Sequence, residues 1–126
     1  KTTRITAAHD AGRSMNPTLY EGQIEGSMHM GLGYAGSEEF PYKDGRPVSL
    51  KMADLGLIKA KDMPPMDIIG IEVPDAVGPY GAKGVGEIGL VPTAAAVANA
   101  LCQLDGVRRT TLPLKDLRLL GKKPKA

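Results

Sequence analysis

The chain has 126 residues, of which 42% are hydrophobic and 24% charged, values typical of one globular domain. Its 16 basic and 14 acidic side chains nearly cancel, so the net charge of +2 does not favour nucleic acid as a partner. A single cysteine, Cys102, excludes an internal disulfide and a metal site built from several cysteines. No apolar run has the length of a membrane span, and no signal peptide is evident, which predicts a cytoplasmic protein.

Glycine is unusually abundant, at 16 of 126 residues, and it is clustered in segments 22–36 and 78–89. Clustered glycine predicts backbone that approaches another group closely or turns through positive φ. Aromatic residues make up only 4% of the chain, with no tryptophan and one phenylalanine. The core must therefore consist mainly of aliphatic side chains, methionine and alanine.

The first half of the chain predicts a strand, a loop and a long helix. Residues 4–9 alternate partly between apolar and polar side chains, as a short strand does, and residues 10–17 have loop composition. We expect a helix from Thr18 onward, because Thr18 and Glu21 are spaced as a capping box. Two sets of residues follow helical spacing in this segment: Leu19, Gln23, Gly26 and Met30, and also Ile24, Met28, Leu32 and Ala35.

The second half predicts three further strands and a second helix. The expected elements, in order, are a strand at 39–42, a turn at 44–47, an irregular connection with a short helical piece at 48–61, a strand at 67–73, a long loop at 74–89, a helix at 91–104 and a last strand at 107–112. This order predicts an α+β fold, a two-layer sandwich with a mixed sheet and two main helices. We expect residues 1–117 to form the domain and residues 118–126 to form a flexible basic tail.

The loop at residues 78–89, GPYGAKGVGEIG, is the segment with the clearest chemical potential. A glycine-rich loop before a helix exposes N–H groups that can hold an anion, and Lys83 adds a positive charge. Its spacing matches neither a P-loop nor the dinucleotide fingerprint. Glu87 is the only carboxylate in the loop. Apolar neighbours would raise its pKa toward the range of a general base if it faced inward, whereas the alternative is a solvated glutamate on a surface turn.

The segment GAKGVGE at residues 81–87 resembles the G-x-K-G-V-G-E motif of the xanthine dehydrogenase/aldehyde oxidase family of molybdenum hydroxylases. Other segments resemble motifs of the same family in the same order: DAGRSMNP at 10–17, EGQIEG at 21–26, GLGY at 31–34, DMP at 62–64, PTAAAVANA at 92–100, GVR at 106–108 and LPL at 112–114. The resemblance covers most of residues 7–117. It is to the C-terminal part of the large subunit, which binds the molybdenum cofactor.

The resemblance implies a part of an enzyme that hydroxylates an N-heterocycle, such as the purine xanthine, or an aldehyde with oxygen derived from water. It implies that Glu87 is the general base and that no residue of this chain ligates the metal. The implied cofactor is molybdenum-molybdopterin, for which analogy favours the cytosine dinucleotide form. The resemblance implies these cofactor-binding residues: Gln23, Gly22, Lys83, Gly84, Val85 and Gly86.

The implied partners are a small-molecule substrate, the remainder of the large subunit, and subunits or domains that carry iron–sulfur clusters and FAD. Because upstream cofactor loops of the family are absent here, we expect a cut or split chain that is inactive alone and can homo-oligomerise. Three alternatives remain open: a non-catalytic assembly or anion-binding module, a phosphate-binding regulator, and an ordinary surface role for Gln23. Asp10 and Arg13 could simply pair across their loop.

Overall fold

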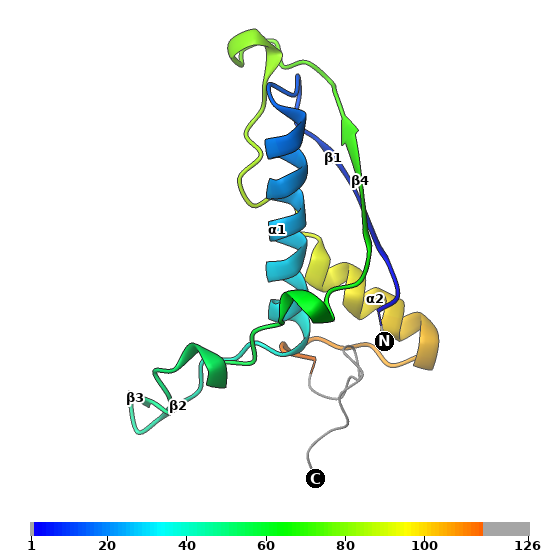
Figure 1. Ribbon diagram of the computed structural model, residues 1–126. Coiled ribbons are helices and arrows are strands. Elements are labelled where there is room, and N and C mark those ends of the chain that lie inside the picture. The colour runs from blue at the N-terminus through cyan, green and yellow to red at the C-terminus, as the bar shows by residue number, and fades with distance from the viewer. Residues whose placement is uncertain (1, 115–126) are drawn as a thin grey trace.

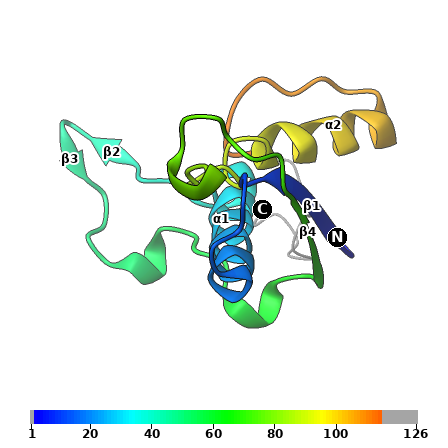
Figure 2. The ribbon, with the colours of Figure 1, turned by 90° about the horizontal axis from the view of Figure 1, so that it is seen from above.

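The computed structural model describes residues 2–114, which are built around one long helix. Helix α1 (Pro17–Gly36) runs through the centre, and strands β1 (Ile5–Asp10) and β4 (Met66–Ile71) lie along one side of it (Figure 1). Helix α2 (Thr93–Asp105) crosses the lower half of α1 and packs against it. Seen from above, α2 and the strand pair lie on different sides of α1 (Figure 2).

Strands β1 and β4 form a parallel pair, in register from Ile5 opposite Met66 to Asp10 opposite Ile71. Parallel strands cannot be joined by a tight turn, so the chain must cross over between them. Helix α1 supplies the crossover. As a consequence, the carboxyl ends of both strands lie at the same end of the molecule as the start of α1 (Figure 1).

Helix α1 begins one residue earlier than predicted and has a different cap. The Asn16 side chain accepts a hydrogen bond from the Leu19 N–H at 3.0 Å, and Pro17 occupies the first turn. Proline suits this position because its fixed φ is helical and the N–H it lacks would have no partner there. The predicted capping box of Thr18 and Glu21 is therefore wrong.

One of the two helical sets on α1 forms the core. Ile24 and Ala35 are fully buried, and Met28 and Leu32 are nearly so. Ile24 and Met28 pack with Ala7 of β1 in a core cluster that is mainly aliphatic, as the shortage of aromatic residues predicted. The other set faces outward: Leu19 is 71% exposed and Met30 is 44% exposed.

Helix α2 ends at Asp105, one residue beyond the predicted end, and Gly106 caps it in the left-handed conformation with φ 75°. Its first residue, Thr93, is buried against Gly31 of α1. A methyl group on Gly31 would lie 2.5 Å from the Thr93 Cβ, so glycine permits the close crossing of the two helices. The last turn of the helix is not covered by the described residues, since Leu104 is 82% exposed.

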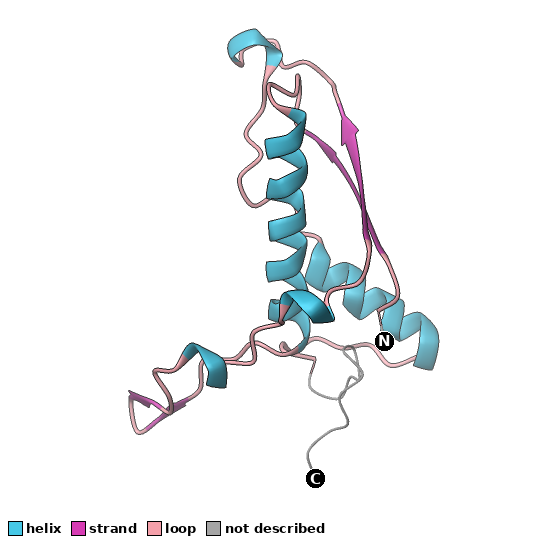
Figure 3. Ribbon diagram, in the orientation of Figure 1, coloured by secondary structure: helices cyan, strands magenta, loops and turns pink. Residues whose placement is uncertain are grey.

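An arm at residues 39–57 projects from the body between α1 and β4 (Figures 1 and 3). Its strands β2 (Tyr42–Lys43) and β3 (Arg46–Pro47) pair antiparallel around a turn, so the predicted strand at 39–42 is shorter and starts later. The predicted short helical pieces are the 3₁₀ turns η1 (Met52–Asp54) and η2 (Ala60–Asp62). The α+β class is confirmed, with one parallel pair and one separate antiparallel pair.

The predicted last strand at 107–112 is wrong. A strand needs the edge of another strand to satisfy its backbone groups, and this segment instead runs past the end of α1. It is anchored there by Leu114, which is 2% exposed and donates its N–H to the Ala35 carbonyl at 2.7 Å. The predicted domain boundary at 117 and the basic tail at 118–126 lie outside the described residues. Within residues 2–114, no helix combines the length and apolar character needed to cross a membrane.

Candidate functional site

The glycine-rich loop at residues 82–89, called the site loop here, begins beside the end of β1. The 3₁₀ turn η3 (Pro79–Gly81) leads into it. Ala82 forms a β-bridge with Gly12, and the Lys83 N–H donates to the Ala11 carbonyl at 2.9 Å. Backbone hydrogen bonds therefore fix the first two residues of the site loop to the segment that follows β1.

Asp10 adds a side-chain anchor at the same place. Its Oδ1 accepts hydrogen bonds from the N–H groups of Gly12 at 2.8 Å and Val73 at 3.1 Å. Its Oδ2 lies 2.5 Å from the Lys83 Nζ, 73 residues away in the sequence. The Lys83 ammonium first, and then the two backbone N–H groups, lower the pKa of Asp10 to about 2. Asp10 pairs with Lys83, and the alternative of a pair with Arg13 is wrong.

Gln23 connects α1 to the middle of the site loop. Its Nε2 donates to the Gly86 carbonyl at 2.5 Å, across 63 residues of sequence. Both residues are exposed. The structure thus brings together two of the residues that the resemblance assigned to cofactor binding, and it does so immediately before Glu87.

The glycines around this contact divide into two kinds. A methyl group on Gly89 would lie 2.8 Å from the Ser27 Cβ, so the end of the site loop needs glycine to pack on α1. By contrast, methyl groups on the following four glycines would meet no atom within 4 Å: Gly22, Gly26, Gly84 and Gly86. Nothing within the described part of the chain requires glycine at those four positions.

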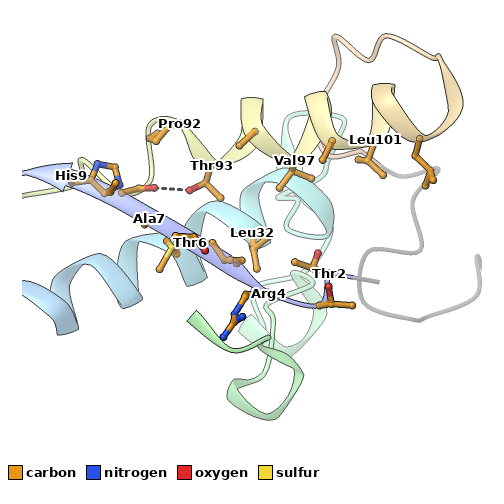
Figure 4. A pocket seen from close by; sticks show the side chains of 18 residues that line it. Thr2, Arg4, Thr6, Ala7, His9, Leu32, Pro92, Thr93, Val97 and Leu101 are labelled. Carbon is orange, nitrogen blue, oxygen red and sulfur yellow. Dashed lines mark hydrogen bonds between the residues drawn. The ribbon is translucent and has the colours of Figure 1, made fainter. Parts of the chain in front are cut away.

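Two other side chains of the site loop face the body of the molecule. Val85 and Ile88 are partly buried and pack against the core cluster. The Thr93 hydroxyl donates to the Gly89 carbonyl at 2.6 Å (Figure 4). Because Val85 packs against the core, the exposed groups of the site loop are the backbone at Gly84 and Gly86 and the Glu87 side chain.

Glu87 lies on the turn that leads from the site loop into α2. Its carbonyl accepts hydrogen bonds from the N–H groups of Leu90 at 2.9 Å and Val91 at 3.4 Å, which closes the turn. Its side chain is exposed, and no hydrogen bond or ion pair within residues 2–114 engages the carboxylate. The described part of the chain therefore does not enclose Glu87 among apolar side chains.

No metal cluster is built from the described residues. They contain no group of three or more histidine, cysteine, aspartate or glutamate side chains placed to hold an ion. His29 Nε2 lies 2.9 Å from the Ile58 carbonyl, and His9 lines a groove of about 680 Å³ between β1 and α2 (Figure 4). Gln23 and the site loop instead offer a side-chain amide and open backbone, a donor and acceptor set suited to a pterin edge. These residues therefore fit a molybdopterin held by hydrogen bonds.

Asp10 is the residue of this region whose connection the sequence did not reveal. Asp10 belongs to the segment DAGRSMNP and Lys83 to the segment GAKGVGE, so both residues lie in motifs that resemble those of the family. Their pairing depends on the parallel register of β1 with β4, which places residue 10 next to the segment after residue 71. Sequence spacing carries no information about that register.

We expect the free energy of unfolding to depend on pH through the contacts of Asp10. Because folding lowers the pKa of Asp10 from 3.8 to about 2, the unfolded chain binds more protons between these values. The stabilisation is therefore complete above pH 3.8 and is lost as the pH falls toward 2. Urea unfolding of the chain between pH 5 and pH 2 should show a steeper loss of stability in wild type than in Asp10→Asn.

The difference between the two proteins is the informative quantity, because a hydrogen bond from Arg109 also lowers the pKa of Asp105 to about 2. That second contribution is common to wild type and Asp10→Asn and cancels in the comparison. Parallel stability curves for the two proteins over this pH range would contradict the assignment of the lowered pKa to Asp10.

Residues 1–64 match the family model described as the molybdopterin cofactor-binding domain. The chain is 37% identical over 118 residues to the xanthine dehydrogenase molybdenum-binding subunit of Escherichia coli O157:H7, covering 92% of this chain and 16% of that protein. It is 40% identical over 125 residues to subunit gamma of the 6-hydroxypseudooxynicotine dehydrogenase complex of Paenarthrobacter nicotinovorans, covering 94% of this chain and 16% of that protein.

A solved structure shows the same fold. The aldehyde oxidoreductase from Desulfovibrio gigas superposes with a TM-score of 0.78 at 34% sequence identity, covering 92% of this chain and 13% of that one. The chain thus spans about one sixth of the length of the curated relatives it matches. The family that the motifs indicated is confirmed. The chain belongs to the molybdopterin cofactor-binding domain family, the family of the molybdenum-binding subunits of xanthine dehydrogenases and aldehyde oxidoreductases.

Proposed function

We propose that this chain forms one wall of the molybdopterin site in a molybdenum hydroxylase and supplies the catalytic base, Glu87. The observation that carries this proposal is the open backbone around the contact between Gln23 and Gly86, directly before Glu87. Each exposed glycine inside a helix costs about 1 kcal/mol relative to alanine. Gly22 and Gly26 have no packing partner among residues 2–114 to explain that cost, which supports a group outside these residues pressed against this face.

The bound molybdenum group would supply two-electron chemistry, accepting the electrons released as a C–H bond becomes C–OH with oxygen from water. The residues of this chain would hold and serve that group. The Gln23 amide and the backbone at Gly84 and Gly86 would contact the pterin. The Glu87 carboxylate would accept the proton that the water-derived hydroxyl must lose.

The substrate would be an N-heterocycle, such as the purine xanthine, or an aldehyde. The relatives support this choice, since they include a xanthine dehydrogenase subunit and an aldehyde oxidoreductase subunit. The remainder of a large subunit would enclose Glu87, whose side chain is exposed here. Iron–sulfur and FAD subunits or domains would remove the electrons in the cytoplasm, and the fragment would be inactive alone. The cofactor would take the cytosine dinucleotide form.

The pairing of Lys83 disfavours the two anion-binding alternatives. A module that holds phosphate or another anion would use the positive charge of the loop. The Lys83 ammonium is instead neutralised by Asp10 at 2.5 Å. A lysine already committed to a carboxylate adds little to anion binding, which leaves the cofactor wall as the better account of the loop.

Gly22→Ala tests the proposal, because its two expected effects have opposite signs. Alanine has the higher helix propensity and meets no atom within 4 Å, so we expect the chain to gain up to about 1 kcal/mol in free energy of unfolding. In the assembled enzyme, the added methyl group would push against the cofactor. We therefore expect lower molybdenum and pterin content per subunit.

Thr18→Ala is the matched control, since it also raises helix propensity at an exposed position of α1 and adds no atom. It should stabilise the chain slightly and leave the cofactor content unchanged. Full cofactor content and full turnover in both Gly22→Ala and Gly26→Ala would overturn the proposed contact between this face and the cofactor.

A further inference from the structure

We propose that Asp10 is a positioning residue for Glu87, which it serves by holding the start of the site loop through Lys83. This inference rests on the proposed function, because it takes Glu87 to be the base. Asp10 itself touches neither the proposed cofactor nor the substrate. Its expected role is to keep the backbone that carries Glu87 in a single position.

The contacts of Asp10 join three segments that are distant in sequence. Asp10 is the last residue of β1 and lies opposite Ile71, the last residue of β4. From there its carboxylate binds the N–H of Gly12 in the loop after β1, the N–H of Val73 after β4, and the ammonium of Lys83 in the site loop. One carboxylate therefore ties both strand ends to the loop.

The backbone that follows Asp10 lies very close to the backbone that leads to Lys83. Gly12 has φ +61°, and a methyl group there would collide with the Gly81 carbonyl and lie 3.0 Å from the Lys83 backbone N. The loop that carries Asp10 and the loop that carries Lys83 are thus in direct backbone contact. The Asp10–Lys83 ion pair lies beside this backbone contact. Its side chains are 32% (Asp10) and 33% (Lys83) exposed.

The site loop needs such an anchor because of its composition. Gly84 and Gly86 lie between Lys83 and Glu87, and neither has a side chain to fix its backbone. The loop is held near Gly86 by Gln23 and at its end by the packing of Gly89 on Ser27. Its beginning is held by the Asp10 pair, by the Lys83 N–H bond to the Ala11 carbonyl and, immediately before the loop, by the Arg13 N–H bond to the Gly81 carbonyl. Releasing the beginning would let the residues before Glu87 take up other conformations.

A direct role of Lys83 at the cofactor makes a different prediction. In that case Asp10→Asn would leave the important charge in place and cost little. If Lys83 acts through Asp10, removing either partner breaks the same link. The effects of the two single variants would then be similar, and the double variant would be no worse than either one.

The experiment compares Lys83→Met, Asp10→Asn and the double variant in the assembled holoenzyme. Asparagine can still accept from Gly12 and Val73, so Asp10→Asn removes mainly the ion pair. We expect each variant to lower kcat by about 10- to 100-fold, because small displacements of a catalytic group are costly. KM, molybdenum content and pterin content should be unchanged, and Lys83→Arg should retain most of the activity.

Asp67→Asn is the control, because it removes the ion pair of Asp67 in β4 with Arg4, the residue before β1, at the opposite end of the strand pair from Asp10. It should leave kcat unchanged. Glu87→Gln is measured in parallel: if it is inactive while Lys83→Met is fully active, the positioning role fails and the proposed function stands. If Glu87→Gln is fully active, the proposed function fails.

Two further results would overturn the positioning role. One is loss of cofactor in Lys83→Met with normal content and kcat in Asp10→Asn, which would assign Lys83 to the cofactor. The other is additive losses in the double variant. If Asp10→Asn does not assemble, the comparison of Lys83→Met with Lys83→Arg tests the positioning role. A lowered kcat in Lys83→Met with a near-normal kcat in Lys83→Arg would show that a positive charge facing Asp10 is required, and an equal kcat in both would contradict the role.

Discussion

Glu87→Gln is expected to lower the kcat of the assembled enzyme by about 10²- to 10⁴-fold, the usual contribution of a general base. Glutamine keeps the size and polarity of the side chain but cannot accept a proton at neutral pH. Because the Glu87 side chain is exposed and makes no hydrogen bond or ion pair within the described residues, the substitution should leave folding intact. Turnover should be measured together with the molybdenum and pterin content.

The separation of chemistry from binding is the decisive feature of this measurement. We expect the cofactor content of Glu87→Gln to equal that of wild type, with the loss confined to turnover. A variant that loses turnover and cofactor in parallel would point to a role in binding. Unchanged turnover with full cofactor content would remove Glu87 from the mechanism and leave only the architecture of the site.

Ile24→Ala is expected to lower the free energy of unfolding of the chain by about 2–5 kcal/mol, the range for truncating a fully buried aliphatic side chain. Ile24 has no exposed surface and lies at the centre of the cluster between α1 and β1. The substitution removes buried apolar area and leaves a cavity that the helix backbone can fill only in part. Urea unfolding followed by circular dichroism measures the difference.

Leu19→Ala is the matched control, since Leu19 lies on the same helix and is 71% exposed. Its loss should change the free energy of unfolding by no more than about 0.5 kcal/mol, the usual effect at an exposed position. Equal destabilisation by the two substitutions would mean that α1 does not bury the face that contains Ile24, and the packing of the whole chain would have to be reconsidered.

Local sequence patterns predicted most of the regular elements. The strand at residues 4–9, the strand at 67–73 and both long helices lie within a few residues of their predicted positions. These elements depend on hydrophobic spacing and on breakers such as Pro65, Pro74 and Gly106, which act through neighbouring residues. The last strand failed because its apolar residues satisfy the same local pattern without having a partner edge.

The choice of the buried face of α1 was outside the reach of local patterns. Two sets of residues fit helical spacing equally well, one with Leu19 and Met30 and one with Ile24 and Met28. The glycines between them do not indicate which of the two sets is buried. Tertiary packing decided the matter, because β1 and β4 pack against Ile24 and Met28, and Thr93 of α2 packs against Gly31.

By itself the sequence determined the family, the proposed base and the proposed cofactor residues, because short motifs preserve the residue types that a given chemistry needs. Only the tertiary structure decided which groups meet: Gln23 with Gly86, and Asp10 with Lys83. It also separated the glycines that this chain needs for its own packing from those it leaves open. The physical reason is that contacts across 63 and 73 residues depend on strand register and helix crossing, which arise only when distant segments pack together.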